Sequence, residues 1–120
     1  MKTLGIDFGD KKIGLAISYN DLAEPLKVIR TCFWPKKLKK ICQEENIKRI
    51  VVGVSEGKMA EKQKRFASEL KKVLNLPVFL VDETLTSKEA IVKMKQVGKR
   101  GREDKFAAAL LLQRFLDKNV

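Results

Sequence analysis

Apolar residues follow two different periods along the chain, and these periods predict both strands and helices. The short apolar runs 3–7 and 13–17 are separated by a glycine-containing turn, and residues 26–31 alternate between apolar and polar types. This pattern is typical of three strands, of which the first two form an antiparallel hairpin. The uninterrupted apolar runs at 49–54 and 77–81 are typical of strands that are buried on both faces and have parallel neighbours.

Helical periodicity separates these later strands and continues to the end of the chain. Apolar positions recur at helical spacing in four segments, namely 35–45, 59–74, 84–97 and 104–117. The element order is therefore β-β-β-α-β-α-β-α-α. It predicts one α/β domain over residues 1–120, built on a five-stranded mixed sheet with its first three strands antiparallel and helices on both faces.

The charge balance adds a partner to this picture. There are 26 Lys and Arg residues against 15 Asp and Glu residues, which gives a formal net charge of +11. An excess of this size favours a polyanionic partner such as RNA or DNA over a merely solvated surface. No apolar run predicts a signal peptide or a membrane span, and the two cysteines form no Cys-x-x-Cys pattern, so we expect a reduced, cytoplasmic protein without membrane association.

The absence of histidine narrows the chemistry that the chain can perform. It excludes mechanisms that use a histidine base, including those of Ser-His and Cys-His enzymes. A catalytic metal would have oxygen ligands, which suit magnesium or manganese.

Three carboxylates occupy the boundaries of predicted buried elements. Asp7 ends the first strand, Glu83 follows the fifth strand and Asp104 begins the last helix. Sites in open α/β sheets form beyond the carboxyl ends of the strands, and converging acids repel one another unless divalent cations neutralise them. Two such cations can support phosphodiester hydrolysis. From spacing alone, Asp82 and Glu103 are equally good candidates for the second and third acids.

Four segments together resemble a known family. They are LGIDFGDKKIGLA at 4–16, VVGV at 51–54, VDETLTS at 81–87 and EDKFAAALLLQRFL at 103–116. In this order and spacing they are similar to the YqgF/RuvX family of Holliday-junction resolvases, also described as pre-16S rRNA processing nucleases. The resemblance implies the ribonuclease H-like fold.

The resemblance also implies a site and an activity. It assigns the catalytic and metal-binding acids to Asp7, Glu83 and Asp104, with two Mg²⁺ or Mn²⁺ ions. The implied activity is metal-dependent hydrolysis of phosphodiester bonds in structured nucleic acid, either an rRNA precursor or a DNA junction. The chain departs from the family at Ser55, where proline is usual, and at Thr84, where an arginine is frequent and would supply a phosphate contact.

Basic residues near these acids are candidates for holding the flanking phosphates. They are Lys12 and, around the start of the last helix, Lys99, Arg100, Arg102 and Lys105. A second basic cluster on the helix predicted at 35–45 is typical of a solvated face. It comprises Lys36, Lys37, Lys39 and Lys40.

Two other interpretations stay open. A non-catalytic RNA-binding or ribosome-assembly module on the same fold would fit the charge equally well, although it gains nothing from three acids that face phosphates. The spacing from Asp7 to Gly14 also resembles the phosphate loop of actin-like ATPases and sugar kinases, which need two such domains to close a cleft. We expect a monomer or a weak homodimer.

Overall fold

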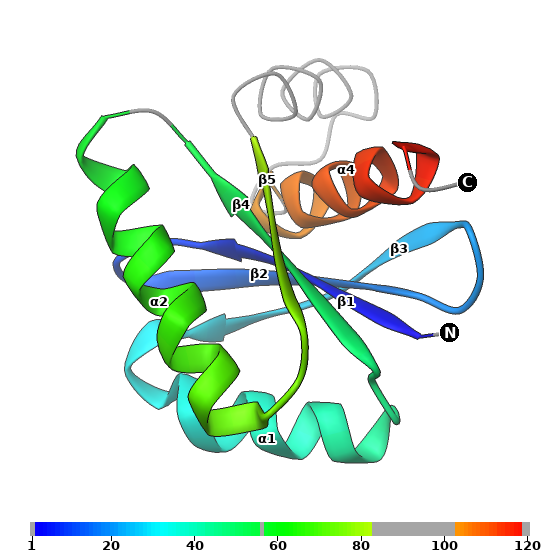
Figure 1. The fold of residues 1–120 in the computed structure, drawn as a ribbon, viewed down its shortest axis with the longest axis horizontal. Helices are drawn as coiled ribbons and strands as arrows, with labels where there is room; N and C mark the ends of the chain where they lie inside the picture. The colour runs from blue at the N-terminus through cyan, green and yellow to red at the C-terminus, as the bar shows by residue number, and fades with distance from the viewer. Residues whose placement is uncertain (1, 56, 83–102, 119–120) are drawn as a thin grey trace.

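The computed structural model describes residues 2–55, 57–82 and 103–118. Figure 1 shows their arrangement, and the elements are β1 (Thr3–Phe8), β2 (Lys12–Ser18), β3 (Ala23–Arg30), η1 (Thr31–Phe33), α1 (Trp34–Glu44), β4 (Arg49–Val54), α2 (Lys58–Leu74), β5 (Val78–Asp82) and α4 (Glu103–Lys118). The helix predicted at 84–97 lies outside the described residues. Within the described ranges, no helix is long and apolar enough to cross a membrane.

The described strands form one mixed sheet in the order β3-β2-β1-β4-β5. The hairpin connections make β1 antiparallel to β2 and β2 antiparallel to β3, whereas the crossovers through α1 and α2 make β1 parallel to β4 and β4 parallel to β5. The predicted mixed sheet is therefore confirmed. Because β1, β4 and β5 run in the same direction, they end at one edge, which we call the carboxyl edge; the opposite one is the amino edge.

Helices cover both faces of the sheet, as predicted (Figure 1). On one face, α1 and α2 pack against large aliphatic side chains such as Leu4 and Ile6 of β1. On the other face, α4 packs against Ala16 and Val51. Successive residues of a strand point to opposite faces. Gly5 and Asp7, which alternate along β1 with Leu4 and Ile6, therefore lie on the α4 face.

The contact between α4 and β1 depends on small residues. A Cβ atom at Gly5 would lie 2.8 Å from Leu112 Cβ and 3.1 Å from the carbonyl oxygen of Ala108. Ala16, the partner of Gly5 in β2, is fully buried against the same helix. The helix therefore lies closer to this part of the sheet than any larger side chain at position 5 would allow.

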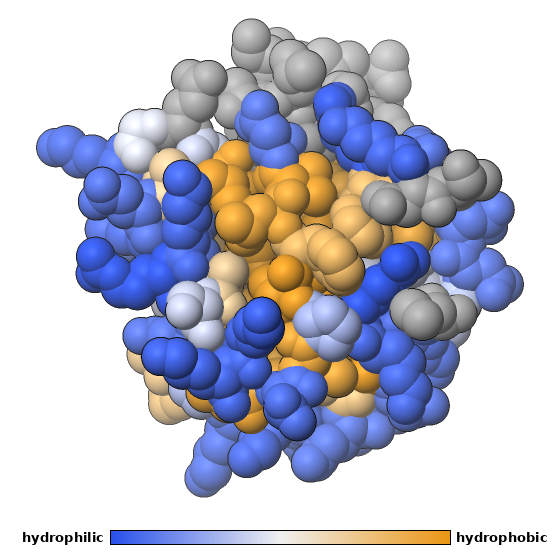
Figure 2. All heavy atoms as spheres, viewed as in Figure 1, coloured by the Kyte–Doolittle hydropathy of each residue, from blue (hydrophilic) through white to orange (hydrophobic). Residues whose placement is uncertain are grey.

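The prediction that residues 77–81 form a strand buried on both faces is wrong. Within the described residues, β5 is the last strand in the sheet, and the side chains of Phe79 and Leu80 are 42% and 50% exposed. Apolar atoms are accordingly visible across the middle of the face shown in Figure 2, where β5 crosses in front in Figure 1. An apolar run does not distinguish a central strand from an edge strand, because that difference depends on pairing with distant segments.

Candidate active site at the carboxyl edge

Asp7 lies near the end of β1, half-buried, on the α4 face of the sheet. The alternation of β1 sets this direction, because Ile6 and Phe8 on either side pack on the α1–α2 face. Its partner across the β1–β2 pair is Gly14. Because glycine has no side chain, the strand next to Asp7 leaves room beside the carboxylate.

Two contacts fix the direction of α4 relative to β1. Ala108, near the start of the helix, lies against Gly5. Phe115, near its end, lies 5.0 Å from the guanidinium of Arg49, which begins β4 at the amino edge. The helix therefore runs opposite to β1, and its amino end points to the edge that carries Asp7 (Figure 1).

The contact of Gly5 with Ala108 also indicates how far Asp7 and Asp104 each lie from a common point. Asp7 is two residues beyond Gly5, or about 7 Å along the strand. Asp104, the second residue of α4, comes one turn before Ala108, or about 6 Å along the helix axis. Both segments therefore continue from one point of contact toward the carboxyl edge over similar lengths. The partial positive charge of a helix amino end favours acidic groups there.

The structure describes only part of the predicted set of site residues. Asp7 is half-buried at the carboxyl edge, and Lys12, which begins β2, is exposed at the same edge. Asp104 and Lys105 lie in the first turn of α4, where the backbone alone is described. Four predicted residues lie outside the described ranges, namely Glu83, Lys99, Arg100 and Arg102. Among the side chains that are described, no three acids or thiols are grouped so that they could hold a metal ion.

Strand alternation separates Asp82 from Asp7. Asp82 pairs with Val54. Two residues earlier on the same strands, Val52 pairs with Leu80, and Val52 packs in the core on the α1–α2 face. Asp82 therefore points to that face as well. Asp82 also lines a shallow hollow of about 330 Å³ together with Lys64 of α2. Asp82, which spacing alone left as an alternative to Glu83, thus faces the side of the sheet opposite to Asp7.

Arg30 is a basic residue of this site that the sequence analysis missed. It pairs with Lys12 across β2 and β3, and the previous row on the same face joins Asp7, Gly14 and Val28. Both basic side chains are exposed, and in the described part of the chain neither forms an ion pair. Like charges directly opposite each other destabilise a sheet. No local motif marks Arg30, because only the register of β3 brings it to this face.

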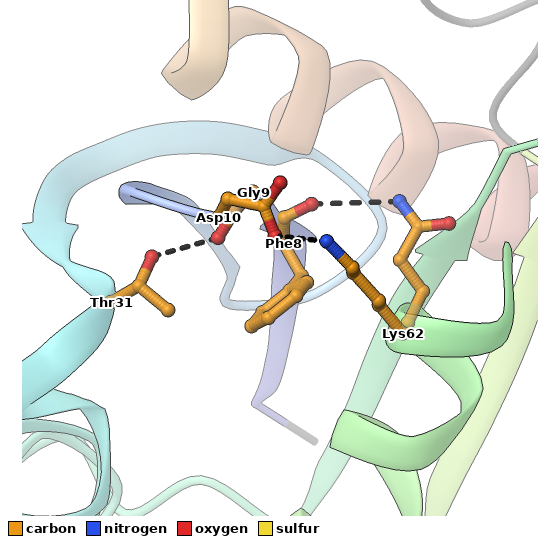
Figure 3. A network of polar contacts seen from close by, with 6 residues as sticks. Phe8, Gly9, Asp10, Thr31 and Lys62 are labelled. Carbon is orange, nitrogen blue, oxygen red and sulfur yellow. Dashed lines mark hydrogen bonds and ion pairs between the residues drawn. The ribbon is translucent and has the colours of Figure 1, made fainter. Parts of the chain in front are cut away.

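The turn after β1 is held from two sides (Figure 3). The Gly9 N–H donates to the carbonyl oxygen of Lys12 at 2.9 Å, and a Cβ at Gly9 would lie only 2.8 Å from that oxygen. Thr31 Oγ1 donates to the Gly9 carbonyl at 2.8 Å, and Lys62 of α2 forms an ion pair with Asp10 at 3.0 Å. These contacts fix the path of the chain directly after the predicted catalytic acid.

A buried glutamine joins the ends of β1 and β4. Gln63 Oε1 accepts hydrogen bonds from the Ser55 N–H at 2.7 Å and from Ser55 Oγ at 3.1 Å, and its Nε2 donates to the Phe8 carbonyl at 3.5 Å. Proline, which is usual at this position in the family that the sequence resembles, has no N–H to donate. The serine at position 55 therefore makes the backbone hydrogen bond to Gln63 possible.

Comparison with solved structures defines the class of fold. The Holliday junction resolvase of fowlpox virus aligns over 100% of both chains with a TM-score of 0.68 at 13% identity. Thermus thermophilus RuvC, in a structure with a Holliday junction substrate, aligns over 99% of this chain and 96% of its own with a TM-score of 0.60 at 14% identity. These matches confirm the ribonuclease H-like fold of resolvases.

Sequence comparison defines the family. The family model RuvX, described as Holliday junction resolvase, matches residues 1–118. Relatives named "Putative pre-16S rRNA nuclease" include that of Syntrophus aciditrophicus, 34% identical over 133 residues, which cover 98% of this chain and 89% of the relative. The relative of Orientia tsutsugamushi is 38% identical over 125 residues, with 92% and 80% covered. The chain belongs to the RuvX family, and the predicted nuclease class is confirmed.

Proposed function

We propose that this protein is a metal-dependent endonuclease that hydrolyses phosphodiester bonds in structured nucleic acid, with Asp7, Glu83 and Asp104 as its catalytic acids. The observation that carries the proposal is the position of Asp7. It is half-buried at the carboxyl edge, on the face along which α4 runs with its amino end toward that edge. Carboxylates that meet at this edge would repel one another unless divalent cations neutralise them.

The donor set fits a hard divalent cation. The chain has no histidine, so Asp7, Glu83 and Asp104 would supply oxygen ligands, the type that Mg²⁺ and Mn²⁺ prefer. Gly14 leaves space beside Asp7 for the bound group. When bound, a pair of such ions supplies charge neutralisation and a water molecule of lowered pKa. Asp82 faces away from Asp7, which supports Glu83 as the second acid. An acid that acts together with Asp7 must lie on the α4 side of the sheet.

Lys12 and Arg30 would hold a phosphate of the substrate next to the acids. Their pairing on the Asp7 face supports this role, since a bound anion removes the repulsion between them. Arg30 would also supply the contact that is lost where Thr84 replaces the arginine frequent in the family. Four further basic residues would hold flanking phosphates, namely Lys99, Arg100, Arg102 and Lys105.

An rRNA precursor is the substrate that the comparisons favour. Relatives that are 34% and 38% identical carry the name of a pre-16S rRNA nuclease, whereas the solved resolvases share only 13% and 14% identity and support the fold. We therefore propose the rRNA precursor as the substrate and treat a DNA junction as the competing outcome of the test.

The test is a cleavage assay on labelled rRNA precursor, single-stranded RNA, duplex DNA and junction DNA, with Mg²⁺, Mn²⁺ or a chelator. We expect metal-dependent cuts in the precursor that disappear in Asp7→Asn. Asp21→Asn is the matched control, because Asp21 undergoes the same chemical change at an exposed turn outside the proposed site. Cleavage that persists in Asp7→Asn or in chelator contradicts the proposed site. Preferential cutting of the junction contradicts the substrate, and binding without cleavage of any substrate favours the RNA-binding module.

A further inference from the structure

A basic groove of about 490 Å³ lies between β3 and α1, away from the site described above. Lys27 of β3 and three lysines of α1 line it, together with Ile41 and Glu44. The three are Lys36, Lys37 and Lys40. All four lysines are exposed, so their ammonium groups are available to a ligand.

The charges in this groove are not balanced by the described residues around them. Glu44 lies 3.8 Å from Lys40, which is one turn earlier in the same helix. Lys27, Lys36 and Lys37 form no ion pair in the part of the chain that the structure describes. A concave surface lined by charges of one sign concentrates the field and attracts counter-ions. The groove therefore has the electrostatics of an anion-binding surface.

The structure divides the lysine cluster that the sequence suggested was merely a solvated face. Lys39 points away from the groove and lines another hollow with Cys42 and Asn46. Lys36 and Lys37, by contrast, share the groove with Lys27, which comes from a different element. The helical period of α1 alone does not explain why lysines of two elements line one groove. The register of β3 with β2 places Lys27 on the side of α1.

We infer that this groove is a second nucleic-acid site, which holds the phosphate backbone of a substrate arm outside the position of cleavage. The identity of the occupant depends on the nuclease function proposed above. Lysine ammonium groups bind phosphates as point charges and read no base, so this contact is independent of sequence.

The position of the groove relative to the site supports a continuous path for one backbone. Arg30 follows Lys27 by three residues on β3, which is about 10 Å along the strand. Lys27 faces α1 and Arg30 faces the Asp7 side, so the basic residues pass around the outer strand from the groove to the carboxyl edge.

The test compares two triple variants with the same loss of charge. One is Lys27→Gln, Lys36→Gln and Lys37→Gln; the other is Lys48→Gln, Lys71→Gln and Lys72→Gln, three exposed lysines outside the groove. Binding to a labelled rRNA precursor is measured in chelator over a series of salt concentrations. We expect the groove triple to lose about tenfold or more in affinity and its log–log salt slope to fall by about two to three, at about 0.9 per phosphate contact. The control triple changes affinity less than about twofold.

The outcomes separate this inference from the nuclease proposal. Restored affinity in the triple Lys→Arg variant supports the groove, and an unchanged kcat at saturating substrate shows that it acts in binding rather than in chemistry. Equal losses in the two Gln triples would overturn the groove, whether or not the wild-type protein cleaves RNA. A loss specific to the groove triple in a protein that cuts no substrate would retain the groove and refute the nuclease.

Discussion

The two edges of the sheet treat their charged residues differently. At the amino edge, Arg49 and Lys2 have partners within the described chain. Arg49 Nε donates to Thr3 Oγ1 at 2.6 Å while its guanidinium lies 5.0 Å from the ring of Phe115, and Lys2 lies 4.0 Å from Glu45. These contacts join β1, β4, α4 and the end of α1. The amino edge is therefore built for stability.

At the carboxyl edge, two positively charged side chains face each other across neighbouring strands. Lys12 and Arg30 stand opposite each other, beside the row of the half-buried carboxylate of Asp7. This difference supports the function proposed for the carboxyl edge, because a bound phosphate would relieve the repulsion between Lys12 and Arg30. Substitutions at the two edges should consequently separate activity from stability.

The largest expected effect is the loss of cleavage in Asp7→Asn. We expect a decrease in kcat of at least about a hundredfold, the scale seen when a group that stabilises transition-state charge is removed. The urea midpoint should change little, because asparagine keeps the size and shape of the side chain at this half-buried position. Parallel cleavage and urea unfolding measurements check this, with Asp21→Asn as control. A fall in kcat that is matched by a fall in stability would contradict the separation of the two edges.

Gln63→Ala should lower stability at the carboxyl edge. It leaves the Ser55 N–H and the Phe8 carbonyl without this partner, which costs about 1–3 kcal/mol of unfolding free energy. Urea unfolding measures the loss. Gln43→Ala, at an exposed position of α1, is the control and should change the free energy by less than about 0.5 kcal/mol.

Arg49→Gln should produce the opposite profile to Asp7→Asn. It removes the hydrogen bond to Thr3 and the contact with the Phe115 ring, and we expect a loss of about 1–2 kcal/mol of unfolding free energy. Cleavage at saturating substrate should stay within about twofold of wild type in conditions where the variant is folded. A large fall in kcat with little loss of stability would show that the amino edge takes part in the chemistry.

Arg30→Gln should give the smallest effect, mainly on binding. One lost phosphate contact lowers the log–log salt slope by about 0.9 and weakens binding several-fold. Stability should rise slightly, since the repulsion with Lys12 is removed. Fluorescence titration over a salt series measures the slope, and Arg30→Lys should restore most of it. An unchanged slope in Arg30→Gln would exclude Arg30 from the phosphate contacts.

The sequence predicted the elements of the fold well because their signals are local. The run RIVVGV identifies β4 to the residue, and the helical spacing of Phe66, Ala67 and Leu70 identifies the buried face of α2. Cys42 of α1 lies in the core, and burial raises the pKa of its thiol to about 11. In each case the hydrophobic pattern of one segment contains the information.

The predictions that failed depend on pairing between distant segments. The exposure of Phe79 follows from the outer place of β5 in the described sheet, and Arg30 joins the Asp7 face only through the register of β3 with β2. The sequence did suggest Asp7 and Lys12, because both stand in the first hairpin motif. Neither the face of Asp82 nor the convergence of Lys27 with α1 could be read before the strands were aligned.

The outer strand β3 has a consequence for self-association. Pro25 interrupts its supply of N–H donors, the register with β2 shifts next to it, and Lys27 and Arg30 put positive charge on both of its faces. These are features that prevent two sheets from joining edge to edge. A second copy of the chain would therefore not extend the sheet through β3. A two-fold assembly able to make paired cuts in a junction would have to form through a different surface.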